Sequence, residues 1–194
     1  MDYTEGTEEK KRKRAKKMML WFGIISLAMS FAAFTSAYVV SRERPDWLAD
    51  FELPQAFTIS LLVIILSSLS MEFAKRSIMK GSQKAGTSLL LTTFVLGCVF
   101  IWLQFVGFSQ IIESYGYNFT GATSNPKTTF IYLIAVVHIA HVVVALVALL
   151  VTLAKQLRNG YSDGNTLGLE LTATFWHFVD ILWIYLFLFF YFVR

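Results

Sequence analysis

The stretch TTFIYLIAVVHIAHVVVALVALLVTL, residues 128–153, contains no aspartate, glutamate, lysine or arginine. An α-helix rises about 1.5 Å per residue, so about 20 apolar residues cross the hydrocarbon core of a bilayer. Membrane barrels use strands of about 10 residues in which apolar and polar side chains alternate, and this stretch does not alternate. It therefore predicts a transmembrane helix, which satisfies its own backbone hydrogen bonds in lipid.

Further apolar runs of similar length occupy residues 18–40, 54–74, 86–112 and 167–193. Charged residues make up only 15% of the chain, where a soluble domain has about 25%. We expect an all-α integral membrane protein, in which residues 18–194 form a five-transmembrane-helix bundle. The short loops make successive helices antiparallel neighbours. Residues 1–17 are expected to form a disordered basic tail.

The basic residues are unevenly distributed, because seven of the seventeen lie between Lys10 and Lys17. With a cytoplasmic N-terminus, thirteen basic residues fall on the inside and four on the outside. Cytoplasmic loops are enriched in lysine and arginine, so the N-terminus is expected inside and the C-terminus outside. A basic cluster beside a membrane span sets topology and attracts anionic lipid, and we therefore expect no nucleic-acid partner.

Few ionisable side chains lie at membrane depth. His138 and His141 are in the fourth run, and Glu170, His177 and Asp180 are in the fifth. Helical spacing places each set on one face of its helix. Ionisable groups in lipid cost several kcal/mol, so these side chains should face protein, headgroups or water. The spacing predicts a polar seam between the fourth and fifth helices.

Three interpretations of this seam remain open, in decreasing order of preference. The groups lock two helices together, they carry protons, or they ligate haem or a metal ion. Three histidines cannot supply the four ligands of a dihaem cytochrome, and a dinuclear metal centre would require more carboxylates. From the residues alone we expect no catalytic residue and no metal site in this chain.

Residues 170–187, ELTATFWHFVDILWIYLF, resemble the signature of the cytochrome c oxidase subunit III family, E-x-x-x-x-Y/F-W-H-F-V-D-x-x-W. The match includes Trp176, His177, Asp180 and Trp183. Other resemblances lie on the remaining helices: HIAHV at residues 138–142, Phe100 with Gln104, the pair Ser67 and Ser68, and YVVSR at residues 38–42. Together they cover all five runs and are similar to the short, five-helix form of the family.

This resemblance implies a non-catalytic subunit III of an aerobic haem–copper terminal oxidase in a bacterial inner membrane. It implies that haem and copper reside in partner subunits I and II, with a fourth subunit and a respiratory supercomplex as further partners. The implied roles are stabilising subunit I, holding phospholipid in a V-shaped cleft, and supporting proton uptake and oxygen access. His138, His141, Glu170, Trp176, His177 and Asp180 are the candidates for the polar seam or the lipid cleft.

Two positions depart from the family pattern. Leu27 stands where the family has a glutamate linked to proton uptake, and Gly107 stands where an acidic residue is expected. Both differences weaken a direct proton-path role. Subunit III of a quinol oxidase or of a nitric-oxide-reductase-associated homologue is the alternative within the family. A stand-alone small transporter is the alternative outside it, although the chain lacks internal repeats and correspondingly placed broken spans.

Overall fold

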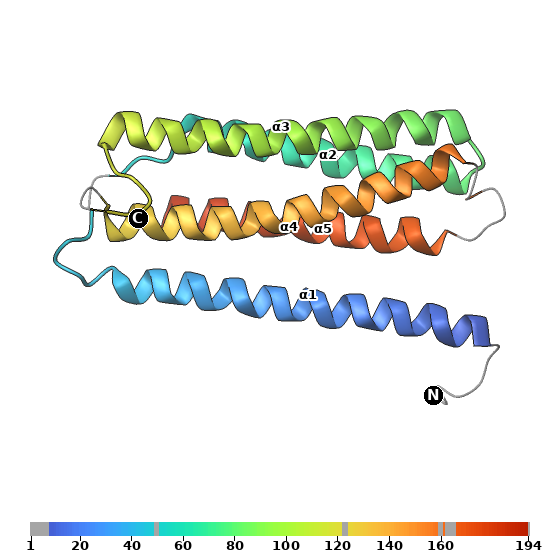
Figure 1. The fold of residues 1–194 in the computed structure, drawn as a ribbon, viewed down its shortest axis with the longest axis horizontal. Helices are drawn as coiled ribbons and strands as arrows, with labels where there is room; N and C mark the ends of the chain where they lie inside the picture. The colour runs from blue at the N-terminus through green and yellow to red at the C-terminus, as the bar shows by residue number, and fades with distance from the viewer. Residues whose placement is uncertain (1–7, 49–50, 122–123, 159–160, 162–165, 194) are drawn as a thin grey trace.

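A computed structural model of the chain describes residues 8–48, 51–121, 124–158, 161 and 166–193. It contains five helices (Figure 1): α1 Glu8–Ser41, α2 Gln55–Met79, α3 Gln83–Tyr115, α4 Pro126–Leu157 and α5 Leu167–Phe192. Each is long and apolar enough to cross a membrane, and the described residues contain no strand. The predicted all-α membrane fold is confirmed. The start of α1 and the end of α5 lie at opposite ends of the bundle (Figure 1).

The helices extend beyond most of the apolar runs that predicted them. The third run, 86–112, lies within Gln83–Tyr115, and the second, 54–74, is followed by one more turn of α2 to Met79. Backbone hydrogen bonding can continue where the side chains become polar, so apolarity marks the membrane core and not the helix ends. The start of α4 is well defined: the Asn125 side chain accepts from the Lys127 backbone N–H at 3.0 Å.

The basic segment before the first apolar run corrects the prediction of a disordered tail. Residues 8–17 form the first turns of α1, whereas residues 1–7 lie outside the described part. Lys11 pairs with Glu8 at 3.1 Å and Lys13 with Glu9 at 2.7 Å. Such pairs, together with acidic residues in the first turn, stabilise a helix. These local pairs explain why the polar segment continues the helix.

Helices α2 to α5 pack as a four-membered group in which α2 contacts α3 and α5, and α4 also contacts both. Helix α1 packs on α4 and α5 (Figure 1) and does not contact α2, so the prediction that successive helices are neighbours is wrong for this pair. The segment that connects α1 to α2 passes the start of α4 and is hydrogen-bonded to it. Asn125 Nδ2 donates to the Asp46 carbonyl at 2.8 Å, and Lys127 Nζ donates to the Leu48 carbonyl at 2.9 Å.

Candidate functional site

The interface between α2 and α5 carries two matching pairs of tryptophan and serine. Trp176 Nε1 donates to Ser67 Oγ at 3.2 Å, and Trp183 Nε1 donates to Ser60 Oγ at 3.2 Å. Both indoles are buried. A spacing of seven residues is two helical turns, so the pairs repeat along the two antiparallel helices. We call Ser60, Ser67, Ser68, Trp176, His177 and Trp183 the α2–α5 ladder.

His177 continues this ladder towards the C-terminal end of α2. Its Nδ1 lies 2.7 Å from Ser68 Oγ, and its Nε2 lies 3.7 Å from a carboxylate oxygen of Glu72. The same carboxylate pairs with Arg76 at 2.7 Å and with Lys75 at 3.6 Å. His177 therefore contacts a charged group on α2 that is partly open to the surface.

Glu170 lies in the first turn of α5 and contacts α1. Its carboxylate accepts from Lys17 Nζ at 2.7 Å and from the Thr166 hydroxyl at 3.0 Å. The predicted seam between the fourth and fifth helices is thus wrong in its partners, because Glu170 contacts α1 and His177 contacts α2. Helical spacing identifies residues that share a face, but several neighbouring helices can contact that face.

His138 lies in the aromatic core, at the place where α3, α4 and α5 meet. Its ring stacks on Trp183 with centroids 5.1 Å apart, and Phe100 and Phe31 approach it edge-on at 5.9 and 6.2 Å. Neither ring nitrogen has a hydrogen-bond partner among the described residues. His141 behaves differently: its Nδ1 donates to the Val137 carbonyl one turn earlier at 2.7 Å.

Asp180 is buried in α5, with only 1% of its surface exposed. Neither carboxyl oxygen has a hydrogen-bond partner among the described residues. A buried acid without a strong partner is costly at membrane depth. Leu27, at the position where the family has a glutamate, is half-buried on α1.

The described residues include no group of three or more histidine, cysteine, aspartate or glutamate side chains placed to hold a metal ion. The His138 ring is enclosed by other aromatic rings, and His177 faces Ser68 and Glu72 on another side of α5. These two imidazoles are therefore not arranged as a facing ligand pair. The hydrogen bonds of the ladder join α2 to α5.

Glycines bring α3 close to its neighbours, which the sequence reasoning did not identify. A Cβ atom at Gly97 would lie 2.8 Å from both Leu146 Cδ2 and Trp176 Cη2. At Gly107 it would overlap the ring of Phe57. Small residues at helix contacts let backbones approach closely in membranes. Gly97 thus makes the space into which the Trp176 indole fits.

Comparison with known proteins identifies the family to which these helices belong. The family model described as Cytochrome c oxidase subunit III matches residues 5–194. This chain belongs to the cytochrome c oxidase subunit III family. It is a multi-pass membrane protein, and the segment carrying the earlier resemblance, residues 170–187, supplies the α5 side of the ladder.

Several proteins named cytochrome c oxidase subunit 3 are similar to this chain. The one from Spodoptera frugiperda is 32% identical over 144 residues, which cover 74% of this chain and 93% of that protein. The one from Gadus morhua is 31% identical over 141 residues, covering 73% of this chain and 50% of that protein. The one from Drosophila yakuba is 29% identical over 175 residues, covering 85% and 64%. The chain therefore spans about half the length of several relatives that it matches.

Proposed function

We propose that this chain is the non-catalytic subunit III of a haem–copper terminal oxidase that accepts electrons from cytochrome c. The observation that carries the proposal is the family match over residues 5–194, supported by relatives named cytochrome c oxidase subunit 3. The partners would be subunits I and II, which would hold the haem and copper. A fourth subunit and a respiratory supercomplex are further partners in this proposal.

The main proposed role is to stabilise subunit I from the side. All five helices expose large apolar side chains, for example Met29 on α1, Leu62 on α2, Trp102 on α3, Val151 on α4 and Ile181 on α5. Inside, the α2–α5 ladder ties the helices with hydrogen bonds that no water competes for. A stiff bundle with apolar outer faces can cover a partner's apolar flank and keep lipid in place against it.

A supporting role in proton uptake and oxygen access is proposed to be indirect. Leu27 provides no carboxyl group at the position where the family has one, so it cannot relay a proton there. Asp180, His138, His141, Glu170, His177 and Trp176 are proposed to act by holding the helices and the bound lipid. The proposed membrane is the bacterial cytoplasmic membrane, with the basic start of α1 inside, because thirteen of seventeen basic residues then lie on that side.

The deciding experiment compares the oxidase with and without this chain. Oxygen consumption is recorded continuously from the first turnovers until activity is lost. We expect the initial rate to survive removal of the chain, because the redox centres reside in the partner subunits. The working life during turnover should shorten, because the flank of subunit I and its lipid are uncovered. Loss of the initial rate in a haem-loaded partner would contradict the non-catalytic role, and equal lifetimes would contradict the stabilising role.

A second variant separates a direct proton role from a structural one. Leu27→Glu restores a carboxyl group at the family position without changing the length of α1. The structural proposal expects little change in turnover, because the surrounding bundle is unchanged. A clear gain in oxygen consumption at high pH, where proton supply limits the rate, would show that this position contributes directly to proton delivery.

A further inference from the structure

His177 connects α5 to α2 through both nitrogens of its ring. Its Nδ1 lies 2.7 Å from Ser68 Oγ, and its Nε2 lies 3.7 Å from Oε2 of Glu72. Ser68 and Glu72 are four positions apart on α2, so they lie on successive turns of the same helix face. Ser68 therefore orients the ring so that its second nitrogen points towards the carboxylate.

The Glu72 carboxylate divides its contacts between its two oxygens. Oε1 accepts a hydrogen bond from Arg76 Nε at 2.7 Å. Oε2 lies 3.6 Å from Lys75 Nζ and 3.7 Å from His177 Nε2, and both distances exceed that of a normal hydrogen bond. Because Oε2 lies between two groups without bonding closely to either, a stronger attraction from His177 would draw it towards α5.

Protons can reach this pair from the surface of the bundle. The His177 side chain is 28% exposed and the Glu72 side chain is 31% exposed. Lys75 and Arg76 directly follow the apolar run that ends at Ala74, which places the pair near the edge of the membrane. Histidine ordinarily titrates near pH 6.5, so its charge changes within the physiological range.

Two cations and one further acid lie near the pair on its own helices. Lys75 and Arg76 on α2 both pair with Glu72, so they compete with His177 for the carboxylate. Asp180 follows His177 by three positions on α5 and is buried. A positive charge on His177 would therefore meet the Glu72 carboxylate against the repulsion of two cations that the same carboxylate partly neutralises.

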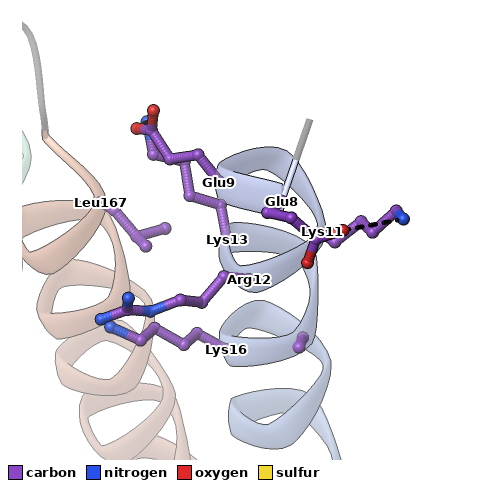
Figure 2. A pocket seen from close by; sticks show the side chains of 8 residues that line it. Glu8, Glu9, Lys11, Arg12, Lys13, Lys16 and Leu167 are labelled. Atoms are coloured by element: carbon purple, nitrogen blue, oxygen red, sulfur yellow. Dashed lines mark hydrogen bonds and ion pairs between the residues drawn. The ribbon is translucent and has the colours of Figure 1, made fainter. Parts of the chain in front are cut away.

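The other helices that pack on α5 bring their charges to different levels. From α1, Lys17 pairs with Glu170, two turns before His177. Figure 2 shows the other charged residues at the start of α1 beside Leu167, which lies about 15 Å before His177 along α5. From α4, the His138 ring stacks on Trp183, beyond His177 in the opposite direction. Among the described residues, Glu72 is thus the acidic group that faces the His177 ring.

We propose that protonation of His177 closes a latch between α2 and α5, in which Nε2–H donates to Oε2 of Glu72 while the ring stays bonded to Ser68. A hydrogen bond between charged partners is about twice as strong as one between neutral partners. The latch tightens as the pH falls through the titration of His177, and it opens again where the pH is low enough to protonate Glu72. This inference goes beyond the proposed function, because it concerns contacts within the chain itself.

The first test measures the proton affinity of His177. The chain has three histidines, so NMR of the full chain in detergent micelles, with labelled histidine, follows each ring separately. Glu72→Gln removes the facing carboxylate. Glu170→Gln is the matched control, because it removes the same charge from a residue that contacts Lys17 instead.

We expect the proton affinity of His177 to fall about threefold to tenfold in Glu72→Gln, the size of a charge contact at this separation in a water-like dielectric. The control should change it by less than about twofold. Equal changes in the two variants would overturn the direct contact in favour of a diffuse field.

The second test measures whether protonation moves the helices. Spin labels at the exposed positions Phe73 on α2 and Ile181 on α5, in a Cys98→Ser background, report the α2–α5 distance distribution. It should be narrower at about pH 5.5 than at about pH 8, on either side of the histidine titration. His177→Gln keeps a hydrogen-bond donor but takes up no proton, so it and Glu72→Gln should show no such change. A distribution that ignores pH in the parent, or that narrows equally in His177→Gln, would overturn the latch.

Discussion

At the scale of single residues, the serines of α2 explain how large indoles are buried inside a membrane bundle. An indole N–H in lipid has no water to bond, and leaving it unpaired costs free energy. Ser67 and Ser60 supply small acceptors that also allow α2 to approach α5 closely. Each pair therefore links close packing of the two helices to satisfaction of a buried donor.

The Trp176–Ser67 pair should show a measurable coupling. We expect the double variant Ser67→Ala with Trp176→Phe to lose less stability than the sum of the losses in the two single variants. The difference, which is the coupling energy, should be about 0.6 to 2 kcal/mol, the range for interhelical hydrogen bonds in membranes. The free energy of unfolding in mixed detergent micelles, measured for the four members of the cycle, gives this value. Strict additivity would mean that the hydrogen bond contributes nothing to stability.

Gly97 should tolerate no side chain, because a Cβ atom there would approach the Trp176 ring to 2.8 Å. We expect Gly97→Ala to destabilise the bundle by about 1 to 3 kcal/mol, as overpacking does elsewhere. Gly23→Ala is the matched control, because a Cβ atom on that exposed part of α1 meets nothing within 4 Å. Thermal unfolding followed by tryptophan fluorescence compares the two. Equal stability of both variants would contradict the tight contact.

Some of these residues were foreseeable from the sequence and others were not. The spacing of Glu170, His177 and Asp180 predicted a shared face on one helix, but only the helix arrangement shows that α1 contacts Glu170 and α2 contacts His177. The role of Ser60 could not be predicted, because a single serine in an apolar run does not indicate which residue it bonds. Ser60 and Ser67 are seven residues apart, and so are Trp176 and Trp183. This shared spacing was present in the sequence, but the sequence analysis did not use it.

At the scale of elements, α1 is the least embedded helix of the bundle. Its buried apolar residues Ile24, Phe31 and Tyr38 recur every seven positions, which makes a narrow contact stripe against α4 and α5. Two polar contacts to α5 assist the stripe: Lys17 with Glu170, and the Thr35 and Tyr185 hydroxyls 3.1 Å apart. Because the stripe is narrow, these two polar contacts contribute a larger share of the packing stability of α1 than polar contacts do for the other helices.

Reversing the charge of Lys17 should loosen the N-terminal half of α1 from α5. The pair is partly open to solvent, so its contribution is at most about 1 kcal/mol, and Lys17→Glu adds a comparable repulsion. Spin labels at the exposed positions Met19 and Ile181, in a Cys98→Ser background, report the α1–α5 distance distribution. We expect broadening in Lys17→Glu and none in Lys17→Arg. An unchanged distribution in Lys17→Glu would show that the stripe alone holds the helix.

The number and type of the elements were predictable because a transmembrane helix requires about 20 consecutive apolar residues, a length that is distinctive in the sequence. Their ends and neighbours were not. Nine of the first ten residues of α1 are charged and yet helical, since local pairs such as Lys13–Glu9 favour the helix beyond the apolar run. The separation of α1 from α2 depends on how Lys127 and Asn125 fasten the loop between them, which no local pattern reveals.

At the scale of the whole molecule, the charge distribution predicts how the bundle is oriented in the membrane. Seven basic residues between Lys10 and Lys17 supply more than half of the thirteen that the predicted topology places inside. Replacing all seven with glutamine would leave six inside against four outside. We expect a substantial inverted or uninserted fraction, because this bias sets orientation.

Labelling of single cysteines placed at Ser124 and Lys80, with a reagent that does not cross the membrane, reads the orientation directly. These residues lie at opposite ends of the bundle, after α3 and after α2. In the parent only the position at Ser124 should react from outside. A comparison variant removes fewer charges, because only Lys75, Arg76, Lys80 and Lys84 are replaced by glutamine. Its orientation is read from a single cysteine at position 124. If the variant without the seven charges shows the same labelling pattern as the unmodified protein, other residues determine the orientation.

The pairing of α1 with α5 also has a consequence for biosynthesis. Lys17 and Glu170 lie 153 positions apart in the chain. A ribosome adds about 5 to 20 residues per second, so roughly 8 to 30 seconds separate the synthesis of these two side chains. During that interval α1 resides in the bilayer without the helix that completes its contacts. A nascent chain that stops before α5 would leave α1 with its contacts to α4 alone, so part of the contact stripe would face lipid until α5 arrives.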